Sequence, residues 1–295
     1  MEEIIKMITS IGYAVVLVLA APLVAGLIKV SKARMQNRRG PGLLQVYYDL
    51  FKLLQKDSMI SPTTSWIFTL APYIYFAGTF GAAALLMSGD LFALLYLLAA
   101  GRFFLALASL DAGSTFGGMG GSREMYISVL VEPVLLLSML TVAARAGSTK
   151  LAAMSAAAAS TPFSLPYILA AVAFLIILVT ETGRIPVDNP DTHLELTMIH
   201  EAMVLEYSGR RLGLIFLASA SKQLVFILLF VVLFLPWQPG GLSPIMAWVW
   251  LAAKVVISAV ILAVIETSTN KMRLFKVPGF LGLAGMLALL ALVAQ

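Results

Sequence analysis

Long apolar runs, separated by shorter polar segments, extend along the whole chain and predict membrane-spanning helices. A helix needs roughly 20 apolar residues to cross a bilayer, and glycine, proline and charged residues mark where each run ends. The runs lie at about 5–28, 65–88, 91–110, 127–144, 164–181, 212–235, 245–265 and 277–294. The predicted fold is therefore an all-α polytopic membrane protein with about eight transmembrane helices.

The composition agrees with a single transmembrane domain over residues 1–295. Hydrophobic residues make up 60% of the chain and charged residues only 12%, whereas a soluble domain has about 25% charged residues. This balance excludes a soluble globular enzyme. The net charge of +5 does not indicate nucleic-acid binding, which requires basic residues spread over a solvated face, because here they fall between apolar runs.

The chain has no cysteine. This excludes disulfides, thiolate-ligated iron–sulfur clusters and thiolate zinc sites on this chain. We therefore expect no cofactor here, and any such redox centre must belong to a partner.

The basic residues are distributed unevenly between the two ends of the predicted spans. Of the 20 Lys and Arg residues, 14 fall in the loops after the first, third, fifth and seventh spans, and only Lys6, Arg145 and Lys150 fall on the other side. Lys and Arg that flank spans tend to stay in the cytoplasm. We therefore expect the two long loops, at about 29–64 and 182–211, to face the cytoplasm, and both termini to be extracytoplasmic.

Ionisable residues lie within or at the end of the predicted spans, at Arg102, Glu132, Glu181, Lys222 and Lys254. Such a charge costs at least about 2.5 kcal/mol at the centre of a span, so it usually faces a bundle interior or a wet cavity and often marks an ion path. The alternatives are a structural ion pair and a snorkelling lysine. Arg102 does not give up its proton, so it is predicted to be an electrostatic anchor.

The depths of the other four charges suggest a path for protons or ions. Glu181 lies at the inner end of its span, Glu132 nearer the cytoplasmic third, and Lys222 and Lys254 near mid-membrane. Burial raises the pKa of carboxylates and lowers that of lysines, which brings the two types together. We predict a path from the cytoplasmic carboxylates through Glu181 and Glu132 towards the two lysines, with structural pairing as the alternative.

The most polar stretch follows Glu181 and runs to Gly209. Asn189 and Pro190 suit a helix N-cap and first turn, and Gly209 suits a terminator, so a helix over about 190–207 is predicted. The predicted path takes its cytoplasmic carboxylates from this loop, at Asp188, Glu195 and Glu206.

No motif in the sequence predicts catalysis or metal binding. His193 and His200 share one face of the predicted helix, whereas Glu195 and Glu206 lie roughly 150° away, so no single ion takes ligands from both sets. The segment Gly117–Gly121 has no preceding strand and no following Lys-Ser, so it is predicted to be a flexible turn rather than a nucleotide cradle. Nothing supplies a nucleophile and base for covalent catalysis.

The first long loop is strongly basic at its start. Lys32, Arg34, Arg38 and Arg39 lie within eight positions of one another. Such a cluster suits anionic lipid headgroups or a docking surface for a soluble partner, and both interpretations stay open.

Two separated motifs carry a resemblance to a known family. The segment Gln36-Asn-Arg-Arg-Gly-Pro-Gly42, with Asp49 downstream, is similar to the first cytoplasmic loop of the respiratory complex I subunit 1 family. The segment Glu181-Thr-Gly-Arg-Ile-Pro-Val-Asp188 resembles its acidic loop, and Glu132 matches the acidic residue of its fourth core span. The resemblance covers essentially the whole chain.

Within that family the chain resembles most the membrane-anchor subunit of formate hydrogenlyase and other energy-converting group 4 NiFe hydrogenases. The segments that carry this likeness include Arg102-Phe-Phe-Leu, Val131-Glu-Pro133, Glu206-Tyr-Ser-Gly209 and Glu266-Thr-Ser. The stretch Thr192–Met203 departs from the complex I loop, and that loop helps to shape the quinone chamber in complex I, so the resemblance does not establish a quinone site.

The resemblance implies a connector subunit that joins a peripheral redox arm to the membrane and couples electron transfer to H+ or Na+ translocation. The implied partners are hydrogenase-like large and small subunits, an iron–sulfur subunit and antiporter-like membrane subunits, with the iron–sulfur clusters and NiFe site on those chains, besides membrane lipid. The implied docking or chamber residues are Arg38, Arg39, Asp49, Arg123, Glu124 and Arg184.

Three alternatives stay open. One is the quinone-chamber subunit of a respiratory NADH:quinone oxidoreductase. A second is a stand-alone secondary ion transporter, which the absence of an inverted repeat disfavours. A third is a passive anchor whose buried charges are structural pairs.

Overall fold

The chain folds into a bundle of helices. The computed structural model describes residues 2–295 except 88, 161–162, 190–197, 240 and 242. The α-helices are α1 (Glu2–Met35), α2 (Gln45–Gln55), α3 (Trp66–Leu85), α4 (Leu91–Asp111), α5 (Thr115–Ala146), α6 (Leu151–Ser160), α7 (Leu165–Glu181), α8 (His200–Val204), α9 (Gly209–Phe234), α10 (Pro244–Ser268) and α11 (Val277–Val293). A short 3-10 turn, η1 (Leu274–Lys276), precedes α11.

Each of the eight predicted runs coincides with one long helix: α1, α3, α4, α5, α7, α9, α10 and α11. Within the described residues, 7 helices are long and apolar enough to cross a membrane. The eighth, α7, has 17 residues, or about 26 Å at 1.5 Å per residue, which is at the lower limit of length for a span. The chain is thus a polytopic membrane protein.

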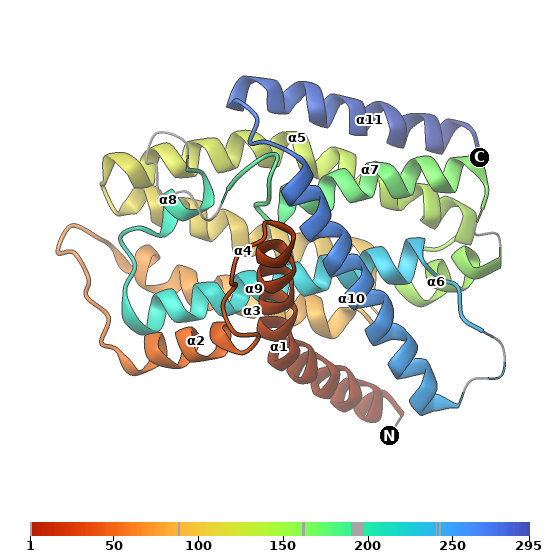
Figure 1. Cartoon of the computed structure of the whole chain (residues 1–295), viewed down its shortest axis with the longest axis horizontal. Helices are drawn as coiled ribbons and strands as arrows, with labels where there is room; N and C mark the ends of the chain where they lie inside the picture. The colour runs from red at the N-terminus through yellow and green to blue at the C-terminus, as the bar shows by residue number, and fades with distance from the viewer. Residues whose placement is uncertain (1, 88, 161–162, 190–197, 240, 242) are drawn as a thin grey trace.

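The most enclosed of the candidate spans is α9, which packs against α1, α2, α3 and α7 (Figure 1). A group of aromatic rings fills the contact between α7 and α9, with Phe174 lying 6.1 Å from Phe230 and 5.2 Å from Phe234 between ring centroids. Helices α10 and α11 lie at the periphery and expose apolar side chains along their lengths. This distribution is expected for a bundle whose outer face meets lipid.

The two long loops meet at one end of the bundle. The backbone N–H of Met59 donates to Ser208 Oγ at 2.8 Å, and the Tyr207 hydroxyl donates to the carbonyl of Phe68 at 2.9 Å. The rings of Tyr207 and Phe68 also stack, with centroids 4.0 Å apart. Burial raises the pKa of Tyr207, so the phenol keeps its proton for this hydrogen bond.

The predicted boundaries of the loops need correction. The first loop begins only after Met35 and contains α2. In the acidic loop, the described part of the predicted helix over 190–207 is only α8 (His200–Val204), and the chain then turns before α9. Soon after the end of α8, Tyr207 contacts Phe68 of α3 through a hydrogen bond and ring stacking.

The prediction of a flexible turn at Gly117–Gly121 is wrong, because these residues form the first turns of α5. Their role is close packing. A Cβ at Gly120 would lie 2.8 Å from Ala202 Cβ and 2.9 Å from Met203 N, so α8 rests directly on the α5 backbone. The lack of a side chain at this position is what lets α8 lie there.

Candidate functional site

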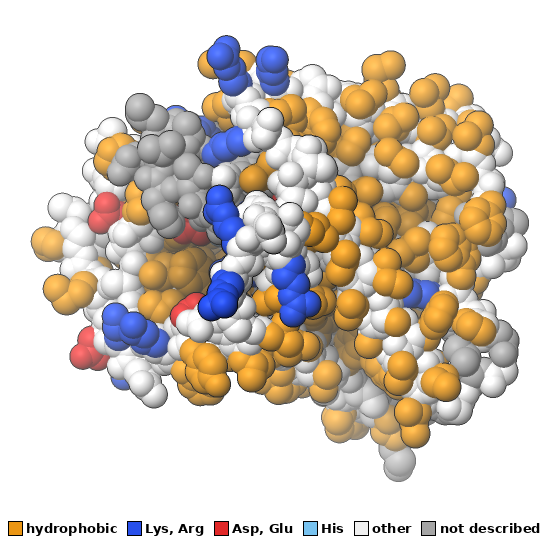
Figure 2. Space-filling model, viewed as in Figure 1, with side chains coloured by type: hydrophobic (Ala, Val, Ile, Leu, Met, Phe, Trp, Pro, Cys, Tyr) orange, Lys and Arg blue, Asp and Glu red, His pale blue; other side chains and the backbone are white. Residues whose placement is uncertain are grey.

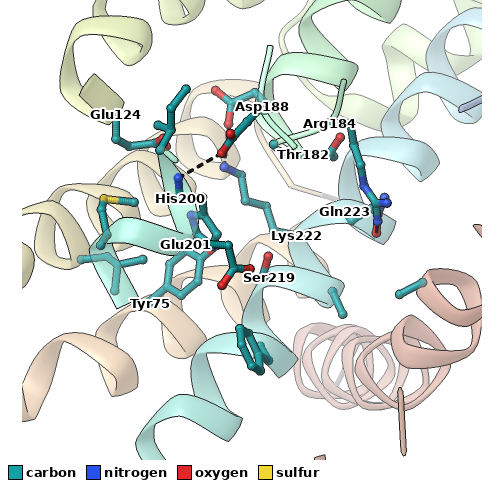
Figure 3. Close-up of a pocket in the computed structure, with 18 of the residues that line it drawn as sticks. Tyr75, Glu124, Thr182, Arg184, Asp188, His200, Glu201, Ser219, Lys222 and Gln223 are labelled. Atoms are coloured by element: carbon teal, nitrogen blue, oxygen red, sulfur yellow. Dashed lines mark hydrogen bonds and ion pairs between the residues drawn. The ribbon is translucent and has the colours of Figure 1, made fainter. Parts of the chain in front are cut away.

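A cavity of about 530 Å³ lies at the loop end of the bundle, within the size range of ligand pockets. Its walls come from α1, α2, α3, α4, α5, α8, α9 and the turn after α7 (Figure 3). Apolar side chains such as Leu105, Ile127 and Phe216 line it together with basic and acidic ones. The cavity lining therefore combines apolar and charged side chains.

One wall of the cavity is a cluster of buried charges from three helices. Arg102 of α4 places Nη1 2.7 Å from Glu181 Oε1 at the end of α7, and Lys222 of α9 places Nζ 2.7 Å from Glu181 Oε2. Each oxygen of this carboxylate thus meets one cation. The side chains of Arg102 and Lys222 are each 9% exposed and that of Glu181 is 1% exposed, so the charges are held by one another rather than by water.

Arg102 also links the cavity to a fourth charge, Glu132 of α5. Its Nη2 lies 3.2 Å from Glu132 Oε1. Glu132 differs from Glu181 because its side chain is 46% exposed. It faces a small groove of about 40 Å³ between α4 and α5, which Arg102, Tyr96 and Leu135 also line. The cluster therefore reaches from the cavity to the outer face of the bundle.

The four charges of this cluster sum to zero. Taking charges out of water costs several kcal/mol per ion unless close opposite charges and hydrogen bonds compensate. Glu181 compensates two cations, and Glu132 restores the balance at Arg102. Lys222 contacts Glu181 directly, whereas the predicted path placed it after Glu132. The path and the anchor role of Arg102 stay predictions.

A second buried cluster lies beside the first. Arg184, just after α7, places Nη1 3.2 Å from Glu266 Oε1, and its Nη2 donates to Gln223 Oε1 at 3.1 Å. Lys32 Nζ lies 3.8 Å from the other oxygen of Glu266. Sequence reasoning gave Arg184 to a docking loop and gave Glu266 no role of its own. The predicted span ended at residue 265, one position short, whereas α10 continues to Ser268.

Beside the two clusters, Asp188 in the turn after α7 lines the cavity and forms a separate ion pair with Lys271. Asp188 Oδ1 accepts from Lys271 Nζ at 2.8 Å, and its Oδ2 accepts from the backbone N–H of His200 at 3.1 Å, marked in Figure 3. Arg123 donates to the carbonyl of Met198 at 2.9 Å. These bonds hold α8 over the cavity, so Asp188 and Arg123 position α8 and the residue Met198 before it. Glu124 and Asp49 also line the cavity.

Other predicted site residues lie away from this cavity. Lys254 donates to the carbonyl of Leu235 at the end of α9, at 2.6 Å. Leu235 is 13 residues beyond Lys222, or roughly 20 Å along the helix, so Lys254 caps a helix end and is not the next member of the buried cluster. Glu206 is exposed between α8 and α9. Arg38 and Arg39 are exposed after α1, and Glu195 lies outside the described residues.

The sequence matches the family described as NADH dehydrogenase over residues 8–294. The chain belongs to this family. It is 37% identical to formate hydrogenlyase subunit 4 of Escherichia coli (strain K12), with 88% of this chain and 89% of that protein covered. It is also 38% identical to hydrogenase-4 component C of the same organism, over 78% and 75% of the two chains.

More distant members of the NADH dehydrogenase family include a subunit of the NADH-quinone oxidoreductase of Syntrophotalea carbinolica. It is 32% identical, with 79% of this chain and 77% of that protein covered. Among solved structures, a chain of the membrane-bound sulfane sulfur reductase, an archaeal respiratory membrane complex, has a TM-score of 0.84 at 20% identity. That comparison covers 100% of this chain and 99% of that one, and it shows the shared fold.

In this member of the NADH dehydrogenase family, the residues around the cavity form ion pairs and offer no evident group for covalent or metal catalysis among the described residues. At the cavity wall Arg102 and Lys222 are paired with Glu181, and among the residues the structure describes, no three His, Asp or Glu side chains gather as metal ligands. A new charge in the cavity would disturb those pairs. Arg102 contacts both Glu181 and Glu132, so it connects the cavity wall to the outer groove through two ion pairs.

Proposed function

We propose that the chain is the membrane connector subunit of a complex I-related, membrane-bound NiFe hydrogenase or formate hydrogenlyase-type complex. It would hold the peripheral redox arm at the membrane and couple electron transfer to translocation of H+ or Na+. The observation that carries the proposal is the buried cluster in which Arg102 joins Glu181, at the cavity, to Glu132, at the outer face of α5. The named relatives support the hydrogenase type.

The proposed coupling begins with a redox event near the loop end that changes the charge in the cavity. An added negative charge there would attract Lys222 and weaken its hold on Glu181, whose second cation is Arg102. Arg102 would then bind Glu181 more strongly and Glu132 less. Glu132 would exchange an ion with groups that meet the outer groove, where the proposed antiporter-like subunits would lie.

The redox centres of such a complex would lie on its other subunits, on a hydrogenase-like large and small subunit and an iron–sulfur subunit, because this chain has no cysteine. The long loops are proposed to face the cytoplasm and both termini the other side, as the basic residues indicate. Since the chain has no native cysteine, Asp57→Cys and Lys150→Cys can each be labelled in intact cells. A membrane-impermeant maleimide that modifies position 57 but not 150 would contradict this orientation.

The coupling role is tested by Glu132→Gln in the intact complex, with the exposed residue Asp57→Asn as the matched control. We expect the Glu132 variant to assemble and to reduce or oxidise a soluble acceptor or donor at the native rate, but to lose ion pumping into vesicles. The control should keep both activities. Full pumping by the Glu132 variant would refute the coupling role, and loss of co-purifying subunits would favour the passive-anchor alternative.

The same purification decides the type of complex. Co-purification of a nickel-containing large subunit and iron–sulfur proteins supports the hydrogenase assignment. Recovery of an NADH-oxidising, quinone-linked module would instead favour the quinone-chamber alternative, and a lone, active chain would favour a secondary transporter.

A further inference from the structure

Exposed cations gather where α1 ends and where α11 begins, and one of them, Lys29, also lines the cavity. The members of this basic patch are Lys29, Arg34, Arg38, Arg39, Arg273 and Lys276. None of these side chains forms an ion pair or hydrogen bond with the described part of the chain. By contrast, the two neighbouring lysines, Lys32 and Lys271, are paired to buried carboxylates. The basic patch is therefore made of cations that no described carboxylate neutralises.

The two segments that carry the basic patch lie side by side. Thr267 Oγ1, near the end of α10, donates to Met35 Sδ at the end of α1, at 3.6 Å. Neither 29–44 nor 267–276 contains Asp or Glu. Figure 2 shows Lys and Arg side chains gathered over these segments, next to the broad apolar face that covers α10 and α11. Positive charge is thus concentrated on a surface that directly borders the membrane-facing one.

The length of α1 predicts that the basic patch lies at the depth of lipid headgroups. The uncharged stretch of α1 over 7–28 has 22 residues, or about 33 Å at 1.5 Å per residue, which matches a hydrocarbon core of about 30 Å. Lys29 follows it directly, and Met35 lies roughly 9 Å further along the helix. Lys276 immediately precedes α11. In Figure 1 the end of α1, the end of α10 and the start of α11 lie at a similar level along the bundle.

An exposed aromatic side chain accompanies these cations. Phe275, in η1 between Arg273 and Lys276, is 91% exposed, and Met35 is 44% exposed. Aromatic and basic residues together at the end of a span are typical of the membrane interface. An apolar ring left in water at this depth has no stabilising contact, whereas lipid would supply one.

We propose that the basic patch binds the headgroup of an anionic phospholipid. The phosphate would lie between the guanidinium groups, which suit bidentate contacts with phosphate oxygens, while Phe275 and Met35 contact the upper part of the acyl chains. Because α1 and α10 also carry Lys32 and Glu266 of the second buried cluster, a bound lipid would brace the helix ends that support the cavity. This inference does not depend on the proposed function.

The test uses the full chain in detergent, titrated with phosphatidylglycerol or phosphatidylcholine and followed by native mass spectrometry. We expect selective binding of phosphatidylglycerol. The double variants Arg38→Gln/Arg39→Gln and Arg273→Gln/Lys276→Gln should each weaken it by roughly tenfold, since each cation near an anionic lipid contributes appreciably. The matched control, Arg145→Gln/Lys150→Gln, removes two cations from the other end of the spans and should bind as the native chain does.

Several outcomes overturn the proposal. Equal binding of the two lipids, or native affinity in both patch variants, removes the headgroup site. Displacement of the lipid by inorganic phosphate at equal concentration would show a free-phosphate site instead. If the patch variants bind lipid normally but lose co-purifying soluble subunits from the intact complex, the basic patch is a protein docking surface. A size-exclusion profile like that of the native chain shows that the variants are folded.

Discussion

The buried cluster makes a strong prediction about Glu181. Glu181→Gln keeps the shape of the side chain and removes the charge that both Arg102 and Lys222 contact at 2.7 Å. The cluster then changes from two cations with two carboxylates to two cations with one. The remaining carboxylate, Glu132, contacts Arg102 only, so Lys222 is left buried beside an amide.

Removing one partner of a buried ion pair typically costs about 3–5 kcal/mol, because the other charge stays in a poorly solvated site. We therefore expect Glu181→Gln to destabilise the fold by about that amount. The double variant Glu181→Gln/Lys222→Met removes the stranded cation and fills its volume with an apolar side chain. It should recover most of the loss, because replacing a whole buried pair by apolar groups is often close to neutral.

The assay is the fraction of purified protein that stays monodisperse in size-exclusion chromatography after heating in detergent. The native chain, both variants and the exposed control Asp57→Asn are heated in parallel. A Glu181 variant as stable as the native chain would refute the pairing argument. So would a double variant no more stable than the single one, because the loss would then not come from the stranded lysine.

Two further predictions concern packing and pH. In Gly120→Val even the first added atom, the Cβ, would lie 2.8 Å from Ala202 Cβ. The variant should therefore displace α8, destabilise the fold by roughly 1–3 kcal/mol and speed proteolysis of the acidic loop. The control Gly12→Val, at a position with open space around it, should have none of these effects. Asp90, the N-cap of α4, has its pKa lowered by the hydrogen bond from Thr149 and by that from Phe92 N–H. The stabilising effect of the Asp90 carboxylate is therefore complete above the unfolded-state pKa of about 4 and is lost as the pH falls through the lowered folded-state pKa. The thermal midpoint should fall more steeply in this range for the native chain than for Asp90→Asn. Equal slopes would contradict the stabilising role of the Asp90 carboxylate.

The helices could be predicted from the sequence because each depends on a local property, a run of apolar residues long enough for a bilayer. The same reasoning found Arg102, Glu132, Glu181 and Lys222, because a charge in such a run is conspicuous. It could not find that Arg102 and Lys222 meet at one carboxylate. That contact depends on the relative rotation and height of α4, α7 and α9, which no local pattern encodes.

The errors have equally specific causes. Glu266 received no role because it lies one residue beyond the predicted end of its span, although in the structure it is buried against Arg184. Gly117–Gly121 suggested a turn because glycine is common in turns, but here the absence of side chains permits close helix packing. The place of Lys254 on the path rests on its depth alone and stays a prediction; its contact in the structure is the carbonyl at the end of α9.

The geometry also separates the roles of the two carboxylates that Arg102 contacts. Neutralising Glu181 leaves Lys222 without a carboxylate and Arg102 with one at 3.2 Å, whereas neutralising Glu132 leaves both cations still bound to Glu181 at 2.7 Å. Glu132 is also the half-exposed member of the pair. Its charge can therefore change without dismantling the buried core. In the proposed coupling, Glu181 would therefore be the fixed charge and Glu132 the exchangeable one, with Arg102 as their common partner.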